Sequence, residues 1–134
     1  MIVGDRVPEL HRRIDLSTLV RYAGASGDFN PIHYDGAYAE AAGLDGVIGH
    51  GMLAMALVSE AVTDWVQDSR RVQSVSARFT RPYRVGDVLT VSGTVVGARD
   101  GAYELSLKCV NQDDVEIIGS ASATVLPDKR SDDG

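Results

Sequence analysis

The sequence has 134 residues, of which 44% are hydrophobic and 24% are charged. A chain of this length fits one compact domain and leaves no room for a separate cofactor-binding domain. Its 13 Lys and Arg residues against 19 Asp and Glu residues give a formal net charge of -6, which repels a nucleic-acid backbone. The composition therefore argues against nucleic acid as a partner.

The cysteine content and the first residues both predict a cytoplasmic protein. Cys109 is the only cysteine, so the chain can form neither an internal disulfide nor a multi-cysteine zinc site, and its place among alternating apolar residues predicts a core side chain. The opening residues MIVGDRVPELHRR carry charges where a signal peptide needs an apolar run. The longest apolar run, roughly residues 51–58, is much shorter than the ~20 residues of a membrane span. We expect no membrane partner.

Helical spacing dominates the first half of the sequence. Asp15 is placed to cap a short helix, and Gly24 marks its end. A loop of turn-forming residues, ASGDFNPIHYD, follows, and the stretch AYAEAA predicts a short helical segment that Gly43 stops. The segment HGMLAMALVSEAVTDWV, which begins at His50, is apolar around nearly its whole circumference. That pattern is typical of a central helix buried on most sides.

The period of the apolar residues changes to two after Arg70. One face of the predicted strands carries Val75, Ala77 and Phe79, and further on Tyr103, Leu105, Leu107 and Cys109. Turn signals at residues 85–87 (VGD), 99–101 (RDG) and 111–114 (NQDD) divide this half into about four antiparallel strands. An apolar helix and a half-buried antiparallel sheet predict an α+β hot-dog fold, in which the sheet wraps around the helix. We expect residues 1–126 to form this single domain and residues 127–134 to be a disordered tail.

The densest chemical signal is the segment SGDFNPIH, residues 26–33. Gly27 and Pro31 predict a stiff turn that carries a carboxylate, an amide and an imidazole. Asp28 and His33 can converge on one small molecule from opposite sides of this loop, without touching each other, as an acid and base pair. The alternative is structural: Asp28 caps a turn and His33 is a satisfied, partly buried histidine.

The segments YAGASGDFNPIHYDGAYA and GHGMLAMALVSE resemble the signature of the MaoC-like hydratases and dehydratases. The pattern S-G-D-x-N-P-I-H, followed by Ala39 six positions after the histidine, has several fixed residues at fixed spacing. Gly4, Asp5 and the stretch RFTRPYRVGD also have counterparts in the family, so the resemblance covers almost the whole chain. Ala25 departs from the larger aliphatic residue or glycine that is usual there, but it removes no chemical group.

The resemblance implies the reversible hydration of a trans-2-enoyl thioester to a (3R)-3-hydroxyacyl thioester. Asp28 and His33 are then the catalytic pair that holds the water, while the assignment of each proton step stays open. Gly51 is implied as the backbone donor to the thioester oxygen, with packing against a strand as its alternative. Ser59 is implied to support Asp28, or else bonds to its own helix backbone. Asn30 is expected to hold the loop.

Other polar residues receive no catalytic role from the sequence. His50 is expected to pack between loop and helix, His11 lies in no motif, and Tyr22 is expected to pack beneath the loop. The resemblance implies no metal and no cofactor. A basic strip without acidic residues contains Arg70, Arg71, Arg78, Arg81 and Arg84. It would suit the phosphates of coenzyme A or an acidic carrier protein, or it is an ordinary solvated surface.

The expected substrate is an acyl-CoA or an acyl-carrier-protein thioester, and the expected assembly is a homodimer or a heterodimer with another hot-dog subunit. The sequence is similar to the catalytic subunit of two-subunit hydroxyacyl-carrier-protein dehydratases, and equally fits a self-sufficient CoA hydratase. Competing functions are a non-catalytic hot-dog subunit and a hot-dog thioesterase. The combination of Asp28, Asn30 and His33 disfavours the first. A hot-dog thioesterase typically carries its catalytic acid on the central helix. The first acidic residue after Gly51 in this sequence is Glu60, late in the predicted helix, which disfavours the second.

Overall fold

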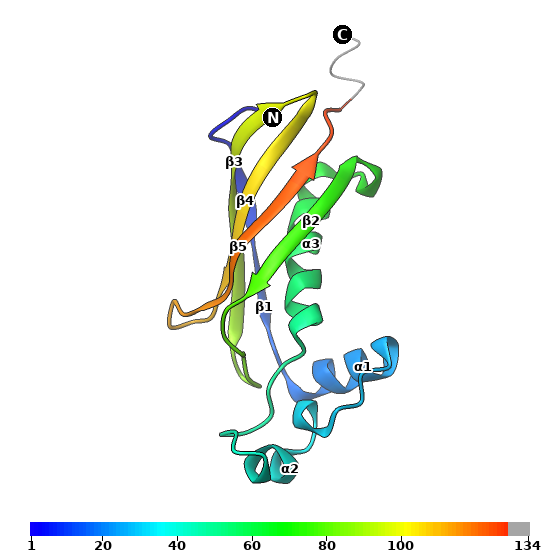
Figure 1. Ribbon diagram of the computed structural model, residues 1–134, viewed down its shortest axis with the longest axis vertical. Helices are drawn as coiled ribbons and strands as arrows, with labels where there is room; N and C mark the ends of the chain where they lie inside the picture. Colours follow the sequence, from blue (N-terminus) through cyan, green and yellow to red (C-terminus); the bar gives the residue numbers. More distant parts are fainter. Residues whose placement is uncertain (129–134) are drawn as a thin grey trace.

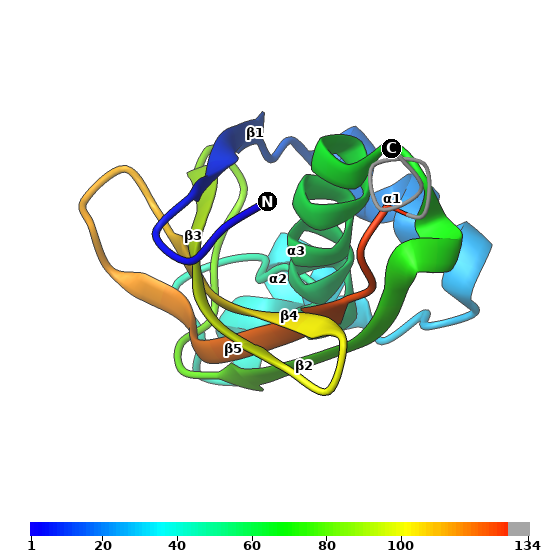
Figure 2. The ribbon, with the colours of Figure 1, turned by 90° about the horizontal axis from the view of Figure 1, so that it is seen from above.

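Five antiparallel strands form one sheet that curves around a 16-residue helix in the computed structural model, which describes residues 1–128 (Figures 1 and 2). The strands are β1 (Arg6–Arg13), β2 (Val72–Phe79), β3 (Val88–Arg99), β4 (Ala102–Val110) and β5 (Glu116–Val125), in the order β1-β3-β4-β5-β2. The helices are α1 (Leu16–Ser26), α2 (Gly36–Ala41) and α3 (Gly51–Val66), with the 3-10 turns η1 (Pro31–His33) and η2 (Ser69–Arg71). This is the α+β hot-dog fold that the sequence predicts. Most of the predicted tail, residues 129–134, lies outside the described residues.

The core lies between one face of α3 and the concave side of the sheet. The buried helix residues recur every three or four positions: Ala54, Leu57, Val58, Ala61, Val62 and Val66. They meet alternate side chains of the strands, among them Leu89 and Val91 of β3 and Leu105 and Leu107 of β4. The other face of α3 is open, because Met52 is 58% exposed and Ala56 is also exposed. The expectation that this helix is buried on most sides is therefore wrong for the single chain.

Strand β1 is absent from the sequence-based prediction, which treats the first half as helical. It pairs with β3, and its register shifts between Val7 and Leu10, on either side of Pro8. Proline donates no hydrogen bond, so it is tolerated only at an edge or an irregular position of a sheet. Only Val7 is buried in this strand, so a two-residue alternation cannot be recognised. The four strands predicted for the second half are confirmed as β2 to β5.

Helix α1 begins as predicted and ends later. The Asp15 carboxylate accepts from the backbone N–H of Thr18 at 2.8 Å, and its hydrogen bonds to Ser17 and Thr18 lower the pKa of Asp15 to about 2. Gly24 lies inside the helix, and the C-cap is Gly27, whose φ of 78° is left-handed. This later end matters for the site, because Gly27 sets the direction of the chain immediately before the loop that carries the predicted catalytic pair.

The remaining local predictions concern a turn and the core cysteine. Asp100 and Gly101 join β3 to β4 with φ values of 56° and 77°, as expected of a tight hairpin turn. Cys109 is fully buried in β4, and burial raises the pKa of its thiol to about 11. Its predicted place in the core is confirmed. Within residues 1–128, the structure contains no helix with the length and apolar content needed to cross a membrane.

Gly93 of β3 allows β3 and β4 to approach closely, and this gives a stability prediction. A Cβ at Gly93 would lie 2.7 Å from Leu107 Cδ2 and 2.9 Å from the backbone oxygen of Ser106. At Gly97 in the same strand, the first contact would be a flexible Glu104 oxygen at 3.3 Å. We expect Gly93→Ala to lower the free energy of unfolding by about 1–3 kcal/mol and Gly97→Ala to change it by less than about 0.5 kcal/mol. Urea titration measures both, and equal midpoints would contradict the close approach.

Candidate active site

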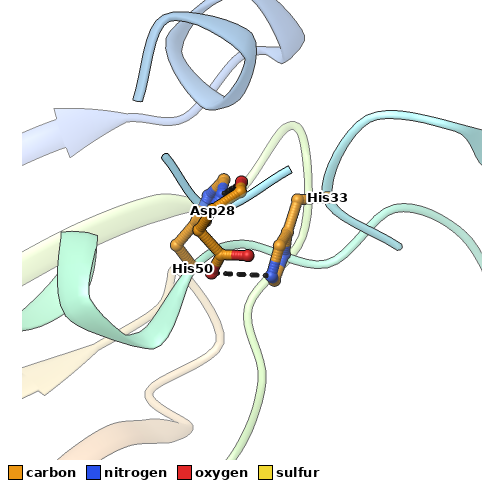
Figure 3. Close-up of side chains that lie close together, drawn as sticks. All are labelled: Asp28, His33 and His50. Atoms are coloured by element: carbon orange, nitrogen blue, oxygen red, sulfur yellow. Dashed lines mark hydrogen bonds and ion pairs between the residues drawn. The ribbon is translucent and has the colours of Figure 1, made fainter. Parts of the chain in front are cut away.

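The predicted catalytic pair and His50 lie around the N-terminal end of α3, the end of the helix near which α1 and α2 also lie (Figure 1). Asp28 follows the end of α1, His33 closes the turn η1, and His50 is the residue before α3. Figure 3 shows that the three side chains face one another although they come from separate segments of the chain. The site thus lies at one end of the central helix, beside the sheet.

The loop that carries Asp28 is held by its own polar side chains. Ser26 Oγ accepts from the backbone N–H of Asp28 at 3.2 Å, and Asn30 Oδ1 accepts from that of Ile32 at 3.2 Å. Pro31 then starts η1 with its backbone angle already restricted. The side-chain-to-backbone bond expected of Asn30 is therefore present. These bonds join residues two apart, so they shape the loop locally without tying it to the rest of the fold.

Asp28 and His33 each use one atom for structure and leave one facing the other residue. Asp28 Oδ1 accepts from the Asn30 backbone at 3.3 Å, and His33 Nδ1 contacts the backbone oxygen of Ile48 at 2.9 Å. The remaining atoms, Asp28 Oδ2 and His33 Nε2, are 3.7 Å apart. The prediction that the two residues do not touch is wrong, because the 3-10 turn brings them within ion-pair distance. The structural alternative, in which Asp28 caps a turn and His33 is a satisfied histidine, accounts for only one polar atom of each side chain.

The contact of His33 with a carbonyl oxygen determines which of its two ring nitrogens carries a hydrogen. A carbonyl oxygen only accepts hydrogen bonds, so Nδ1 carries a hydrogen and donates it to Ile48. In the neutral ring, Nε2 then has a free lone pair directed towards Asp28. The His33 side chain is 10% exposed and that of Asp28 is 52% exposed. The pair thus offers a base and a carboxylate at the rim of the protein, open to a third molecule from the solvent side.

His50 is closer to the pair than the sequence indicates. It is only 1% exposed, its ring stacks on that of His33 with centroids 3.8 Å apart, and Tyr22 packs edge-on against it. Its Nε2 donates to the backbone oxygen of Asp28 at 3.2 Å, while Nδ1 has no partner among the described residues. Burial lowers the pKa of His50, so its ring is neutral near neutral pH. The expected packing role is present, with polar contacts that sequence reasoning missed.

The first turn of α3 adds unpaired backbone donors beside the pair. His50 provides no side-chain cap, and among the described residues the N–H groups of Gly51, Met52 and Leu53 have no hydrogen-bond acceptor. They lie at the positive end of the helix dipole. A Cβ at Gly51 would lie 3.3 Å from the ring of Phe79, so the predicted packing against a strand is also present. Gly51 can therefore combine a structural contact with an exposed N–H group.

Two other predicted residues lie apart from the pair. Ser59 is partly buried in α3, eight residues and therefore ~12 Å along the axis from Gly51. Among the described residues it makes no hydrogen bond to Asp28, so its supporting role stays a prediction. His11, in β1, contacts Thr90 Oγ1 at 2.9 Å on the exposed edge of the sheet. It takes no part in the site, as expected.

The predicted basic strip does not form one surface of free charges. Three of the arginines are engaged: Arg70 with Asp68, Arg84 with Asp45, and Arg71 with the backbone oxygens of Val66 and Leu126. Arg78 and Arg81 are exposed and have no ion pair within residues 1–128. Two free guanidinium groups are a weaker signal for a phosphate site than the five that the sequence suggests.

Asp28, His33 and His50 are the one group with metal-ligand spacing in the part of the chain that the structure describes. Their candidate donor atoms all lie within 4.8 Å of one another. One of these residues, His50, already uses Nε2 to donate to the Asp28 carbonyl. The expected absence of a metal stays a prediction.

Known proteins are similar to this chain in both sequence and fold. The family model "MaoC like domain" matches residues 3–116. The chain is 33% identical to the 3-oxo-4,17-pregnadiene-20-carboxyl-CoA hydratase beta subunit of Mycobacterium tuberculosis, over 75% of this chain and 78% of the relative. It is 32% identical to the (R)-specific enoyl-CoA hydratase of Rhodospirillum rubrum, over 66% of this chain and 62% of the relative.

Larger proteins and a solved structure extend this likeness. The chain is 35% identical to a segment of fatty acid synthase subunit beta of Saccharomyces cerevisiae, matching over 76% of its own length and only 5% of that subunit. The (R)-hydratase from A. caviae involved in PHA biosynthesis superposes with a TM-score of 0.85 at 26% identity, over 95% of this chain and 98% of that one. Matches of this extent show that the chain belongs to the MaoC-like dehydratase family, as the motif around Asp28 and His33 predicts.

Proposed function

We propose that this protein is a hydro-lyase that adds water to a trans-2-enoyl thioester, giving a (3R)-3-hydroxyacyl thioester, and catalyses the reverse dehydration. The observation that carries the proposal is the pair formed by Asp28 Oδ2 and His33 Nε2, 3.7 Å apart at the start of α3. Two relatives named as CoA hydratases support the thioester substrate, and the name of the solved (R)-hydratase supports the stereochemistry.

The two side chains divide the work of this reaction, since one moves the proton and the other holds the water. In dehydration, a base removes the proton from C2 and an acid protonates the hydroxyl that leaves C3 as water. We assign the C2 proton to His33, because its Nε2 lone pair is free when Nδ1 donates to Ile48. The protonated His33 then gives this proton to the C3 hydroxyl, which Asp28 holds on its outer oxygen, so the hydroxyl leaves as water and His33 is neutral again. In hydration, the water held by Asp28 gives a proton to His33 as its oxygen bonds to C3, and His33 passes that proton to C2, so the enzyme regains its starting state.

Removal of the C2 proton places negative charge on the thioester oxygen, and the first turn of α3 is suited to receive it. Gly51 directly follows His50, whose ring stacks on His33, so its unpaired N–H belongs to the residue next in the chain to one that contacts the pair. A backbone donor at a helix N-terminus stabilises such charge by hydrogen bonding and by the helix dipole. The lack of a side chain at Gly51 lets the thioester approach this N–H closely.

The position and contacts of Glu60 argue against the thioesterase alternative. Glu60 is the first acidic residue of α3, and its two oxygens accept from Arg12 at 2.9 and 3.1 Å. It is nine residues beyond Gly51, so it lies ~13 Å along the helix from the proposed thioester position. A carboxylate engaged there cannot serve the same carbonyl carbon as the start of the helix.

The first prediction from the proposed function concerns the catalytic pair. We expect the purified protein to hydrate a short trans-2-enoyl-CoA to the R product, and we expect Asp28→Asn and His33→Ala each to lower kcat by about 10²- to 10⁴-fold, because the first removes the charge that holds the water and the second removes the group that moves the proton. The loss of enoyl absorbance and chiral analysis of the product measure this. Asp113→Asn and His11→Ala change the same residue types at exposed positions away from the site and are expected to retain activity.

Several outcomes would contradict this assignment. Release of free CoA without hydration would indicate a thioesterase. Activity retained in Asp28→Asn or His33→Ala would remove the pair from the mechanism. If the chain is inactive alone on CoA and carrier-protein substrates but active with an added second subunit, the two-subunit form of the proposal applies. Inactivity under all of these conditions would instead indicate a non-catalytic subunit.

A second prediction tests the backbone donor. We expect Gly51→Ala to lower kcat/KM by at least about tenfold, since a methyl group there obstructs the thioester and moves it from the N–H group. The fold should persist, because the added Cβ meets only the half-exposed Phe79 ring, which can shift. Gly24→Ala, where a Cβ meets nothing within 4 Å, is the matched control. Full activity of Gly51→Ala with an unchanged melting temperature would exclude the donor role.

A third prediction concerns assembly. We propose that the open face of α3, with Met52 58% exposed, and the unpaired edge of β2 are covered by a second hot-dog chain, identical or different. Light scattering of the purified chain should therefore give a mass of at least twice 14.3 kDa. A mass of one chain at working concentration, without a co-purifying subunit and with full activity, would contradict this assembly.

A further inference from the structure

His50 is a buried polar residue whose position packing alone does not explain. Within residues 1–128, the buried polar or charged side chains are those of His33 and His50. His50 Nδ1 has no hydrogen-bond partner among the described residues, although an unpaired buried polar atom costs free energy. An apolar side chain of similar size would fill this space without that cost. Packing therefore does not explain why a histidine stands here. The explanation must come from the contacts of His50 Nε2 with Asp28 and of the His50 ring face with His33.

The hydrogen bond from His50 connects the backbone of Asp28 to a part of the chain far from it in sequence. Ser26 and Asn30, which also bond to Asp28, are two residues away and move with the loop. His50 Nε2 instead reaches the Asp28 carbonyl at 3.2 Å across 22 positions of sequence. Because His50 is the N-cap residue of α3, this bond connects the backbone of Asp28 directly to the packed helix.

The same short segment also positions His33. The carbonyl of Ile48 accepts from His33 Nδ1 at 2.9 Å, and the ring of His50 stacks on the ring of His33 at 3.8 Å with an interplanar angle of 26°. Tyr22 of α1 packs edge-on against the His50 ring, with the ring centroids 4.8 Å apart. Residues 48–50 therefore contact both members of the pair, one through a carbonyl and the other through a ring N–H.

Tyr83 holds this segment in turn. Its hydroxyl donates to the His50 carbonyl at 2.6 Å, and its backbone oxygen accepts from Gly49 at 2.8 Å. The Tyr83 ring lies so close to Gly49 that a Cβ there would be 1.9 Å from it. Tyr83 is 1% exposed. A buried residue that makes one side-chain and one backbone hydrogen bond to the segment leaves little freedom for His50 to move.

We propose that His50 is a positioning residue, which sets the separation of Asp28 Oδ2 and His33 Nε2 by donating to the Asp28 carbonyl while stacking on the His33 ring. It transfers no proton itself. Loss of its N–H releases the backbone of Asp28, so the carboxylate samples positions from which it cannot hold the water together with His33. Because the substrate's acyl chain and carrier do not contact His50 in this role, the chemical step suffers more than binding. The inference rests on the proposed hydratase function.

The test compares His50→Gln with His50→Met in the complete chain. The two side chains are nearly identical in shape, and both lose the ring, but only Gln places an N–H near the position of Nε2. In trans-2-enoyl-CoA hydration we expect His50→Met to lower kcat at least tenfold with KM changed less than about twofold. We expect His50→Gln to recover most of that loss. Similar melting temperatures of the two variants exclude a difference in folding as the cause.

The outcomes separate this inference from the proposed function. If wild-type protein shows no hydration with any thioester or added subunit, the proposed function fails. If wild-type protein is active and the Gln and Met variants have equal kcat, whether high or low, the hydrogen-bond role of His50 is overturned. Should both variants fail to fold, Tyr83→Phe tests the same tie, because it removes only the hydroxyl that holds the His50 carbonyl. We expect a several-fold lower kcat at unchanged KM, and an unchanged kcat would overturn the inference.

Discussion

The packing of one face of α3 into the concave side of the sheet is the constraint on which the site depends. Ala54, Val58 and Val62 have no exposed surface, so the helix cannot slide or rotate without opening a cavity in a densely packed core. Its first residue is consequently held at a fixed place at the end of the sheet. The apolar core determines where the site is, and the polar contacts of residues 48–50 determine how the loop between α1 and α3 is shaped around it.

Within the site, structure and chemistry are divided between atoms of the same side chain. A carboxylate has two oxygens and an imidazole has two nitrogens, so one atom can satisfy the backbone while the other stays available. Asp28 and His33 both show this division, and it explains why a structural and a catalytic interpretation of each residue are compatible. It also makes the protonation of His33 a property of the fold, because the carbonyl of Ile48 selects the nitrogen that carries the hydrogen.

The sequence is sufficient for the fold class, the central helix, the strands of the second half and the loop that carries the pair, because each has a strong periodic or turn signal. It fails at β1, where Pro8 and a single buried side chain leave no alternation to detect. It also ends α1 at Gly24 in place of Gly27, since either glycine can stop a helix and only the tertiary contacts decide. The stacking of His50 on His33 joins positions 17 residues apart, and no local pattern reports such a contact.

The two outer strands of the sheet differ in chemistry. Strand β1 contains Pro8 and four charged residues, Arg6, Glu9, Arg12 and Arg13. Strand β2 contains no proline, and its only charged residue is Arg78. Proline and dense charge oppose the addition of another strand, so β1 is protected and β2 is not. A chain with one receptive edge cannot grow into a filament through strand pairing, because two such chains satisfy each other and leave only protected edges outside. The asymmetry of the sheet thus limits this mode of association to closed pairs.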